Sequence, residues 1–129
     1  MDDEYSLFSQ SGWDHLESAH EAFVKTNTST QIYQASLYHQ HRCLDTLRMS
    51  LINASEGCSP LNRGMVEVCL DYLRQSIHCG ADITLEPGTS VTEVNGKKIV
   101  GASGVGVPRV CKDWEQLWRW IRSHAYDII

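Results

Sequence analysis

A short sequence pattern occurs twice in this chain of 129 residues and constrains its fold more than any other feature. Residues 43–52 read Cys-Leu-Asp-Thr-Leu-Arg-Met-Ser-Leu-Ile, and residues 69–78 read Cys-Leu-Asp-Tyr-Leu-Arg-Gln-Ser-Ile-His. Generic amphipathic helices share apolar positions rather than identical Cys, Asp and Arg residues. We therefore expect two similar helices packed as a pseudo-symmetric pair. Within each helix the Asp and Arg, Asp45 with Arg48 and Asp71 with Arg74, can form an ion pair that contributes roughly 0.2–0.5 kcal/mol.

Length and composition indicate one soluble domain. The chain is 42% hydrophobic and 21% charged, which is ordinary for a globular protein. Its formal net charge of −5 argues against a nucleic-acid partner, which requires a basic surface. The sequence contains no membrane-length apolar run, and its acidic start, Met1-Asp2-Asp3-Glu4, does not resemble a signal peptide. We expect a flexible N-terminal segment over residues 1–12 and a single domain over residues 13–129.

The spacing of apolar residues predicts the main elements. A first helix is expected from Trp13 to Val24, and a short strand within residues 31–38. The repeat helices are expected over residues 38–52 and 65–78, with Gly80 ending the second. We expect their inward-facing residues to be Leu44, Leu47, Leu51 and Ile52 in the first helix and Cys69, Tyr72, Leu73, Ser76 and Ile77 in the second.

The C-terminal third changes from helical to strand-like patterning. Residues 83–85 predict a strand, and Asn95-Gly96 between two apolar runs, residues 91–94 and 97–100, predicts a β-hairpin. Asp113 with Gln116 forms a capping-box pattern at the start of a last, Trp-rich helix. The expected fold is therefore α+β and helix-dominated, with two pseudo-repeated packed helices, a small β-hairpin and a C-terminal Trp-rich helix.

The cysteines and two glycosylation sequons bear on the compartment. The five cysteines are buried thiols or metal ligands in a reducing compartment, and disulfides plus one spare thiol outside it. Asn27-Thr28-Ser29 and Asn53-Ala54-Ser55 match the N-glycosylation pattern. Together these features favour a glycoprotein in a secretory-pathway lumen.

Each repeat resembles one half of the signature of the UstYa-like family of fungal toxin-biosynthesis enzymes, in which His-x-x-His-Cys runs into Leu-x-x-Leu-Arg. Residues 69–85 resemble the family as well, as do residues 106–114, and the similarity extends from Trp13 onward. The resemblance implies a tailoring enzyme that acts on a natural-product intermediate in the endoplasmic reticulum or Golgi lumen of a fungus. Members usually carry an N-terminal membrane anchor. None is present in this chain, which is then the soluble part of an anchored protein or an unanchored member.

The resemblance also implies copper bound by histidines, and most of those positions differ here. In the first motif His39 remains, but the second histidine position is Arg42. In the second motif the two positions are Met65 and Val68. A further histidine, often found near the C-terminus of family members, is replaced by Arg109. A guanidinium cannot ligate a metal and repels a cation.

A rebuilt copper site of His39, His41 and Met65 is the alternative to having no metal. His39 and His41 would point apart on a helix and together only on a strand. The remaining histidines, His15, His20 and His124, are expected to be surface or half-buried side chains.

The cysteine positions follow the family more closely than the histidine positions do. Cys43, Cys69, Cys79 and Cys111 all fall on family positions, which implies structural disulfides. Cys58 is either the spare thiol or a partner for Cys43. The connectivity stays open at this stage.

Three functions remain in competition. The favoured one is a metal-independent cyclase, of the pericyclase or Diels–Alderase type, that needs no cofactor. His39, His41, Arg42 and Arg109 would act on the substrate, in a pocket built with Met65, Val68, Tyr72, Asp45 and Asp71. For Arg42 and Arg109 the structural alternative is a salt bridge to Asp45, Glu67 or Asp71. The second function is a copper-dependent oxidase with atypical ligands, and the third is a non-catalytic partner that stabilises an active relative. As for partners, the chain is expected to form a homodimer, or a heterodimer with another family member.

Overall fold

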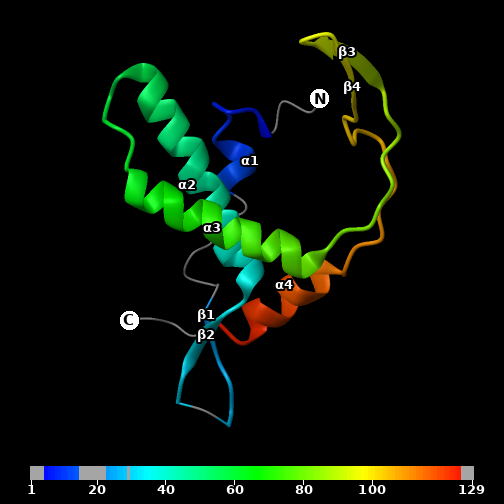
Figure 1. Cartoon of the computed structure of the whole chain (residues 1–129). Helices are drawn as coiled ribbons and strands as arrows, with labels where there is room; N and C mark the ends of the chain where they lie inside the picture. Colours follow the sequence, from blue (N-terminus) through cyan, green and yellow to red (C-terminus); the bar gives the residue numbers. More distant parts are fainter. Residues whose placement is uncertain (1–4, 15–22, 29, 126–129) are drawn as a thin grey trace. The chain divides into compact units, whose positions relative to one another are not determined.

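A computed structural model describes residues 5–14, 23–28 and 30–125, and the chain divides into two compact units (Figure 1). The first unit comprises residues 1–80 and 114–129, and the second comprises residues 81–113. The sequence predicted a single domain. The elements of the first unit are α1 (Ser11–Asp14), β1 (Phe23–Lys25), β2 (Ile32–Gln34), α2 (Ser36–Glu56), α3 (Arg63–Gly80) and α4 (Trp114–Ser123). The second unit holds β3 (Ser90–Val94) and β4 (Lys97–Gly101).

The two repeat helices form as predicted, as α2 and α3, and pack against each other. Gly57 ends α2 in the left-handed conformation (φ 67°), and its N–H donates to the carbonyl of Asn53. At the start of α3 the side chain of Asn62 accepts a hydrogen bond of 3.2 Å from the N–H of Met65. One cap thus ends α2 and the other begins α3, on either side of the link between the two helices.

The buried face of α2 differs from the predicted one. Leu44 and Leu51 are 44% and 59% exposed, whereas Cys43, Asp45, Arg48 and Ile52 are buried. On α3 only Cys69 is buried, and Ile77 is 70% exposed. The helices meet along the line of the two cysteines, and the N-terminal segment covers the Asp45–Arg48 side of α2. The apolar spacing therefore placed Ile52 and Cys69 correctly on the inward side, and Tyr72, Leu73 and Ser76 are half-buried as that spacing predicts. It was wrong for the exposed Leu44, Leu51 and Ile77, and it missed the buried Asp45 and Arg48.

The N-terminal part of the first unit also differs from the prediction. Phe23 and Val24, expected to be helical, belong to β1, which pairs antiparallel with β2; Val24 lies opposite Tyr33. Val24 is buried and forms an isolated bridge with Ala125, and Ile121 of α4 is fully buried. Strand pairing and burial outweigh the helical spacing here. The predicted helix also spans residues 15–22, including His15 and His20, which lie outside the described residues.

The second unit contains the predicted β-hairpin. Strands β3 and β4 pair antiparallel with Val91 opposite Val100, and Asn95 and Gly96 form the turn with φ of 52° and 76°. The strand predicted over residues 83–85 is wrong, since these residues have no strand pairing. Instead the N–H of Thr84 donates to the side chain of Asp82, so its hydrogen bond is local rather than to a neighbouring strand.

The last helix, α4, begins at Trp114, directly after the predicted cap Asp113. Ile121 lies in the core, while Trp114 and Trp120 are 57% and 47% exposed. Trp120 stacks on His124, with ring centroids 4.5 Å apart. Within the described residues, no helix combines the length and the apolar content that a membrane span requires.

Candidate functional site

A disulfide between Cys43 and Cys69 joins α2 to α3, with the two Cα atoms 4.9 Å apart. The two cysteines are the first residues of the two repeats, and both are buried. This pairing excludes the alternative bridge between Cys43 and Cys58. Cys79 and Cys111, for which the family resemblance implied disulfides, are exposed free thiols in the structure, as is Cys58.

Next to this disulfide, two residues predicted for the site are in contact. The His39 ring on α2 stacks on the Tyr72 ring on α3, with centroids 3.9 Å apart and an angle of 19° between the planes. The Tyr72 hydroxyl donates to the carbonyl of Ser36, at 3.5 Å. His39 lies one turn before Cys43, and Tyr72 lies one turn after Cys69, so the disulfide fixes the helix register that brings the two rings together.

The other residues of the first motif lie elsewhere on α2. His41 is two residues from His39 on the same helix, so the two imidazoles project from different sides. Burial lowers the pKa of the half-buried His41 imidazole. Arg42 is exposed and follows His39 at a spacing of i, i+3, which puts the two side chains on one face. The motif therefore presents His39 with Arg42, rather than His39 with His41.

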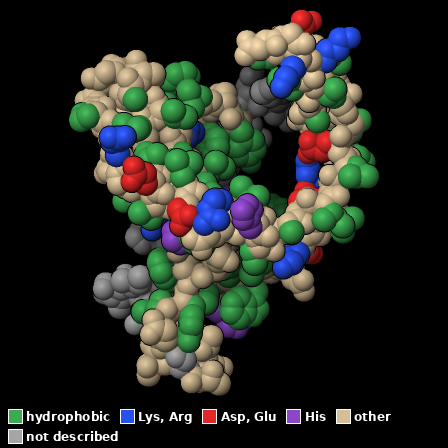
Figure 2. Space-filling model, in the orientation of Figure 1, with side chains coloured by type: hydrophobic (Ala, Val, Ile, Leu, Met, Phe, Trp, Pro, Cys, Tyr) green, Lys and Arg blue, Asp and Glu red, His purple; other side chains and the backbone are tan. Residues whose placement is uncertain are grey.

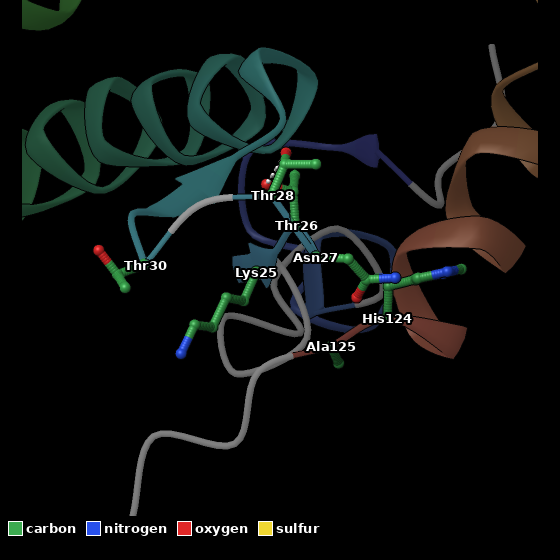
Figure 3. A pocket seen from close by; sticks show the side chains of 7 residues that line it. All are labelled: Lys25, Thr26, Asn27, Thr28, Thr30, His124 and Ala125. Atoms are coloured by element: carbon green, nitrogen blue, oxygen red, sulfur yellow. Dashed lines mark hydrogen bonds between the residues drawn. The ribbon is translucent and has the colours of Figure 1, made fainter.

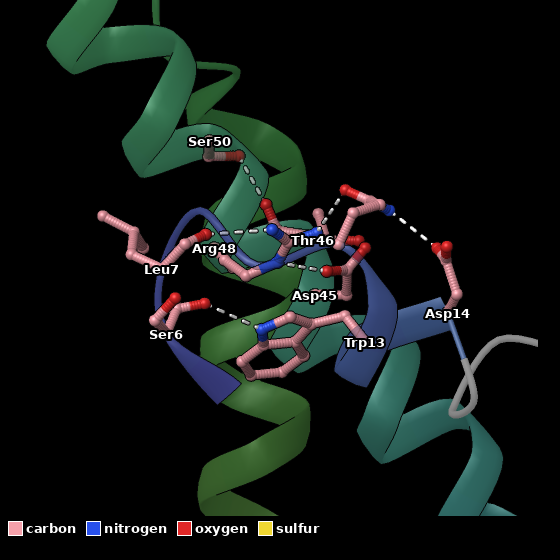
Figure 4. A network of polar contacts seen from close by, with 9 residues as sticks. Ser6, Leu7, Trp13, Asp14, Asp45, Thr46, Arg48 and Ser50 are labelled. Atoms are coloured by element: carbon pink, nitrogen blue, oxygen red, sulfur yellow. Dashed lines mark hydrogen bonds and ion pairs between the residues drawn. The ribbon is translucent and has the colours of Figure 1, made fainter. Parts of the chain in front are cut away.

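Asp45 and Asp71, both predicted pocket residues, are held by arginines of their own repeats. Asp45 is buried and accepts a hydrogen bond of 2.6 Å from Arg48 (Figure 4). Asp71 is exposed and accepts hydrogen bonds from Arg74 and Gln75, which lower its pKa. The first ion pair is thus a buried contact and not the weak surface pair that the sequence predicted, whereas the second is a surface pair as expected.

Arg109, in the second unit, forms ion pairs with Asp82 and Glu86. The predicted salt-bridge partners were other carboxylates, Asp45, Glu67 and Asp71. Hydrogen bonds from the hydroxyl and N–H of Thr84, together with the one from Arg109, lower the pKa of Asp82 to about 2. The carboxylates in turn raise the pKa of Arg109. The guanidinium thus links the segment that follows the hairpin, at residue 109, to the segment that precedes it, at residues 82 and 86.

Met65 and Val68 lie on α3 and are 50% and 63% exposed. Neither lines either of two pockets that the described residues form. One pocket, of about 630 Å³, lies at the β1–β2 turn and the end of α4, and is lined by Lys25, Thr26, Asn27, Thr28, Thr30, His124 and Ala125 (Figure 3). The other, of about 510 Å³, lies on α4 and is lined by Trp114, Glu115, Trp118 and Arg119.

Only part of these two pockets could be predicted from the sequence. Trp114 and Trp118, which line the second pocket, belong to the Trp-rich helix that the sequence predicts. Asn27 in the first pocket had been noted only as a sequon, and His124 only as a surface histidine. Pairing between β1 and β2 sets the β1–β2 turn, and the sequence did not predict that pairing.

Comparison with known proteins identifies the family. The family model described as mycotoxin biosynthesis protein UstYa matches residues 5–124, nearly the whole chain. The chain belongs to the UstYa family. The oxidase ustYa of Aspergillus flavus is 37% identical to it over 90 residues, which cover 69% of this chain and 40% of the oxidase.

Other relatives of the UstYa-family chain include a chlorinase and a further oxidase. The chlorinase cctP2 of Talaromyces islandicus is 33% identical over 101 residues, covering 76% of this chain and 30% of the chlorinase. The UstYa family oxidase phomYb of Diaporthe leptostromiformis is 27% identical over 131 residues, covering 90% of this chain and 50% of that protein. The UstYa-family chain thus spans half or less of the length of these relatives. No solved structure matches it.

Proposed function

We propose that this chain is a tailoring enzyme of fungal specialised metabolism that closes a ring in a small-molecule intermediate without a metal ion. The observation that carries the proposal is the set of residues before the two repeat cysteines: Arg42, Met65 and Val68 occupy positions where the family resemblance implies histidines. The relatives' names, oxidase and chlorinase, support a role in metabolite biosynthesis.

The donor set does not fit a copper site. His39 and His41 project from different sides of α2, and Met65 offers one exposed thioether on α3. Copper in proteins is typically held by several imidazole or sulfur donors that converge on one point. In the part of the chain that the structure describes, no group of three or more His, Cys, Asp or Glu residues could hold a metal ion. The proposed reaction therefore involves no copper ion.

Ring closure by isomerisation requires binding, orientation and a fixed hydrogen-bond donor rather than an electron acceptor. Arg42 is an exposed donor on the same face of α2 as His39, whose ring is held flat against Tyr72. In the proposed reaction the Arg42 guanidinium donates to a substrate carbonyl and stabilises the negative charge that develops there. His39 and Tyr72 provide a planar surface beside it. Arg109 is less available, since two of its nitrogens contact Asp82 and Glu86.

The test uses extract from a fungal strain in which the gene for this chain is deleted, because such extract contains the unconverted intermediate. Purified chain is added in the presence of EDTA, and the products are analysed by mass spectrometry. We expect a product of unchanged mass with one more ring. Loss of a hydrogen pair, or conversion only after copper is added, would contradict the metal-independent proposal.

The variant Arg42→Ala separates the donor from the fold. Without the Arg42 guanidinium the substrate carbonyl loses its donor, so the rate is expected to fall at least tenfold. Because Arg42 is exposed, the circular dichroism spectrum is expected to stay unchanged. Arg63→Ala, an exposed arginine at the start of α3, is the matched control and should retain full turnover.

A second candidate function is that of an oxidoreductase, which the two relatives named as oxidases support. The EDTA experiment distinguishes it, since copper-dependent loss of hydrogen would favour this function. We also propose a secretory-pathway lumen as the location, and the Cys43–Cys69 disulfide supports it, because disulfides persist in oxidising compartments. A dimer with an active relative remains a proposal for the non-catalytic alternative.

A further inference from the structure

The repeat places the same ion pair on two helices in matching positions. The first residues of the repeats, Cys43 and Cys69, are bonded to each other. Equivalent residues of the two repeats therefore lie at equal distances along α2 and α3 from the disulfide. In each copy the Asp accepts from the Nε of the Arg three residues later: 2.6 Å for Asp45–Arg48 and 3.1 Å for Asp71–Arg74. Each copy therefore presents an arginine held in place by its own aspartate.

On α2 this arginine binds the N-terminal strap, which we define as residues 5–14 (Figure 4). Arg48 Nη1 donates to the carbonyl of Leu7 at 2.9 Å, and Nη2 approaches the Gln10 Oε1 at 3.4 Å. Its guanidinium lies 5.2 Å from the centroid of the Trp13 ring. The Trp13 indole N–H donates to the carbonyl of Ser6, at 3.1 Å, and closes the strap on itself. As a result the Arg48 side chain is only 4% exposed.

On α3 the corresponding pair is uncovered. The side chains of Arg74 and Asp71 are 55% and 58% exposed. Among the described residues, the hydrogen bonds of Arg74 go to Asp71 alone. The neighbouring Leu70 and Ile77 are 53% and 70% exposed, and Figure 2 shows hydrophobic side chains reaching the surface over this pair of helices. One difference from α2 is His78, which stands where α2 has the buried Ile52.

We propose that the Asp71–Arg74 face of α3 is a docking site for a strap-like segment of a second polypeptide. The occupied copy on α2 defines what such a segment must offer: a backbone carbonyl for the guanidinium and an aromatic ring over its plane. This chain's own strap is already bound by Arg48, in every copy of the chain. The segment therefore comes from a different polypeptide and not from a second copy.

The probe is a fluorescent synthetic peptide with the sequence of residues 5–14, titrated into the complete chain. We expect saturable binding that Arg74→Ala weakens by roughly tenfold or more, because a charge-assisted hydrogen bond and a ring contact are lost together. Arg63→Ala, on the same helix, should bind as the unmodified chain does. A peptide carrying Trp13→Ala should bind as poorly to the unmodified chain as the original peptide binds to Arg74→Ala.

Nuclear magnetic resonance locates the bound peptide, and shift changes on α3 around Asp71 are the expected result. Absence of binding, or binding that Arg74→Ala leaves unchanged, would overturn the proposal. Shift changes confined to α2 would also overturn it, because they would show exchange with the chain's own strap. Self-association that disappears in Arg74→Ala would assign the surface to a second copy instead. Arg74 is exposed, so the variant is expected to fold.

Discussion

Arg48 and Arg74 occupy the same position of the repeat but have different surroundings. Arg48 is buried, bonded to Asp45 and to the strap, and lies beside Trp13. Arg74 is exposed and bonded to Asp71 within its own helix. A buried ion pair leaves an uncompensated charge when one partner is removed, whereas an exposed pair is replaced by water. The two positions therefore contribute differently to stability despite their identical sequence context.

Arg48→Ala should lower the free energy of unfolding by roughly 3–5 kcal/mol, because Asp45 is left buried without its partner and the strap loses its attachment. Arg74→Ala should cost less than about 1 kcal/mol. Urea unfolding followed by tryptophan fluorescence measures both. Equal effects of the two substitutions would refute the distinction between the two copies.

The lowered pKa of Asp82 leads us to expect that acid destabilises the second unit. The pKa of this carboxyl falls from 3.8 to about 2 in the folded chain, through hydrogen bonds from Thr84 and Arg109. A lowered pKa stabilises the folded form above the unfolded value, and this stabilisation is lost as the pH falls towards the folded value. The protection factors of the β3–β4 amides, which are the ratios of the intrinsic to the observed exchange rate, should therefore be constant above about pH 5. They should fall between about pH 4 and pH 2. Asp82→Asn should remove this dependence, with Glu93→Gln as the control; the same acid response in Asp82→Asn would contradict the assignment.

At the scale of elements, the α2–α3 pair depends on its disulfide. The bridge links residues separated by 26 positions and should stabilise the fold by roughly 3 kcal/mol. The double variant Cys43→Ala with Cys69→Ala and the unmodified chain are both unfolded in urea without reductant, so that the bridge of the unmodified chain stays intact. The double variant should then unfold at a clearly lower urea concentration than the unmodified chain. Cys58→Ala, which removes an exposed thiol, should unfold like the unmodified chain. Coinciding curves for the double variant and the unmodified chain would show that the bridge does not support the packing.

The two sequons lie in different elements, which predicts unequal glycosylation. Asn27 is exposed in the link between β1 and β2, whereas Asn53 is half-buried within α2, where its carbonyl accepts from Gly57 and Cys58. In a chain secreted from a fungal host, Asn27→Gln should remove most of the glycan-dependent mass, and Asn53→Gln should remove little. Mass spectrometry with and without a glycosidase measures this. An unglycosylated secreted chain would count against the sequon at Asn27.

Elements with strong local signals were predictable from the sequence. The repeat helices, the Asn95-Gly96 hairpin and the last helix follow from periodicity, turn chemistry and capping. Phe23 and Val24 were misassigned because their strand pairs with residues in β2 and bridges to Ala125, which no local pattern encodes. On α2 the burial of Ile52 was predicted, but that of Asp45 and Arg48 was missed, because a buried Asp–Arg pair rather than a leucine faces the strap.

At the scale of the whole molecule, the candidate site was only partly predictable. Arg42, Met65 and Val68 stand at positions where the family resemblance implies histidines, and this was evident from the sequence once the two repeats were aligned with that resemblance. The stack of His39 on Tyr72 could not, because it depends on the register that the disulfide sets between two helices. The partners of Arg109 were missed because Asp82 and Glu86 lie on the far side of the hairpin in sequence. Contacts between distant segments were the part that patterns in the sequence did not supply.

The copper content of the chain tests the central claim most directly. The chain is purified from a fungal host grown with added copper, without chelators at any step, and its metal content is measured by plasma mass spectrometry. His39→Ala and Met65→Ala variants prepared in parallel show whether any bound copper depends on the remaining donors. We predict substoichiometric copper, equal in all three proteins. One copper ion per chain, lost in His39→Ala, would contradict it.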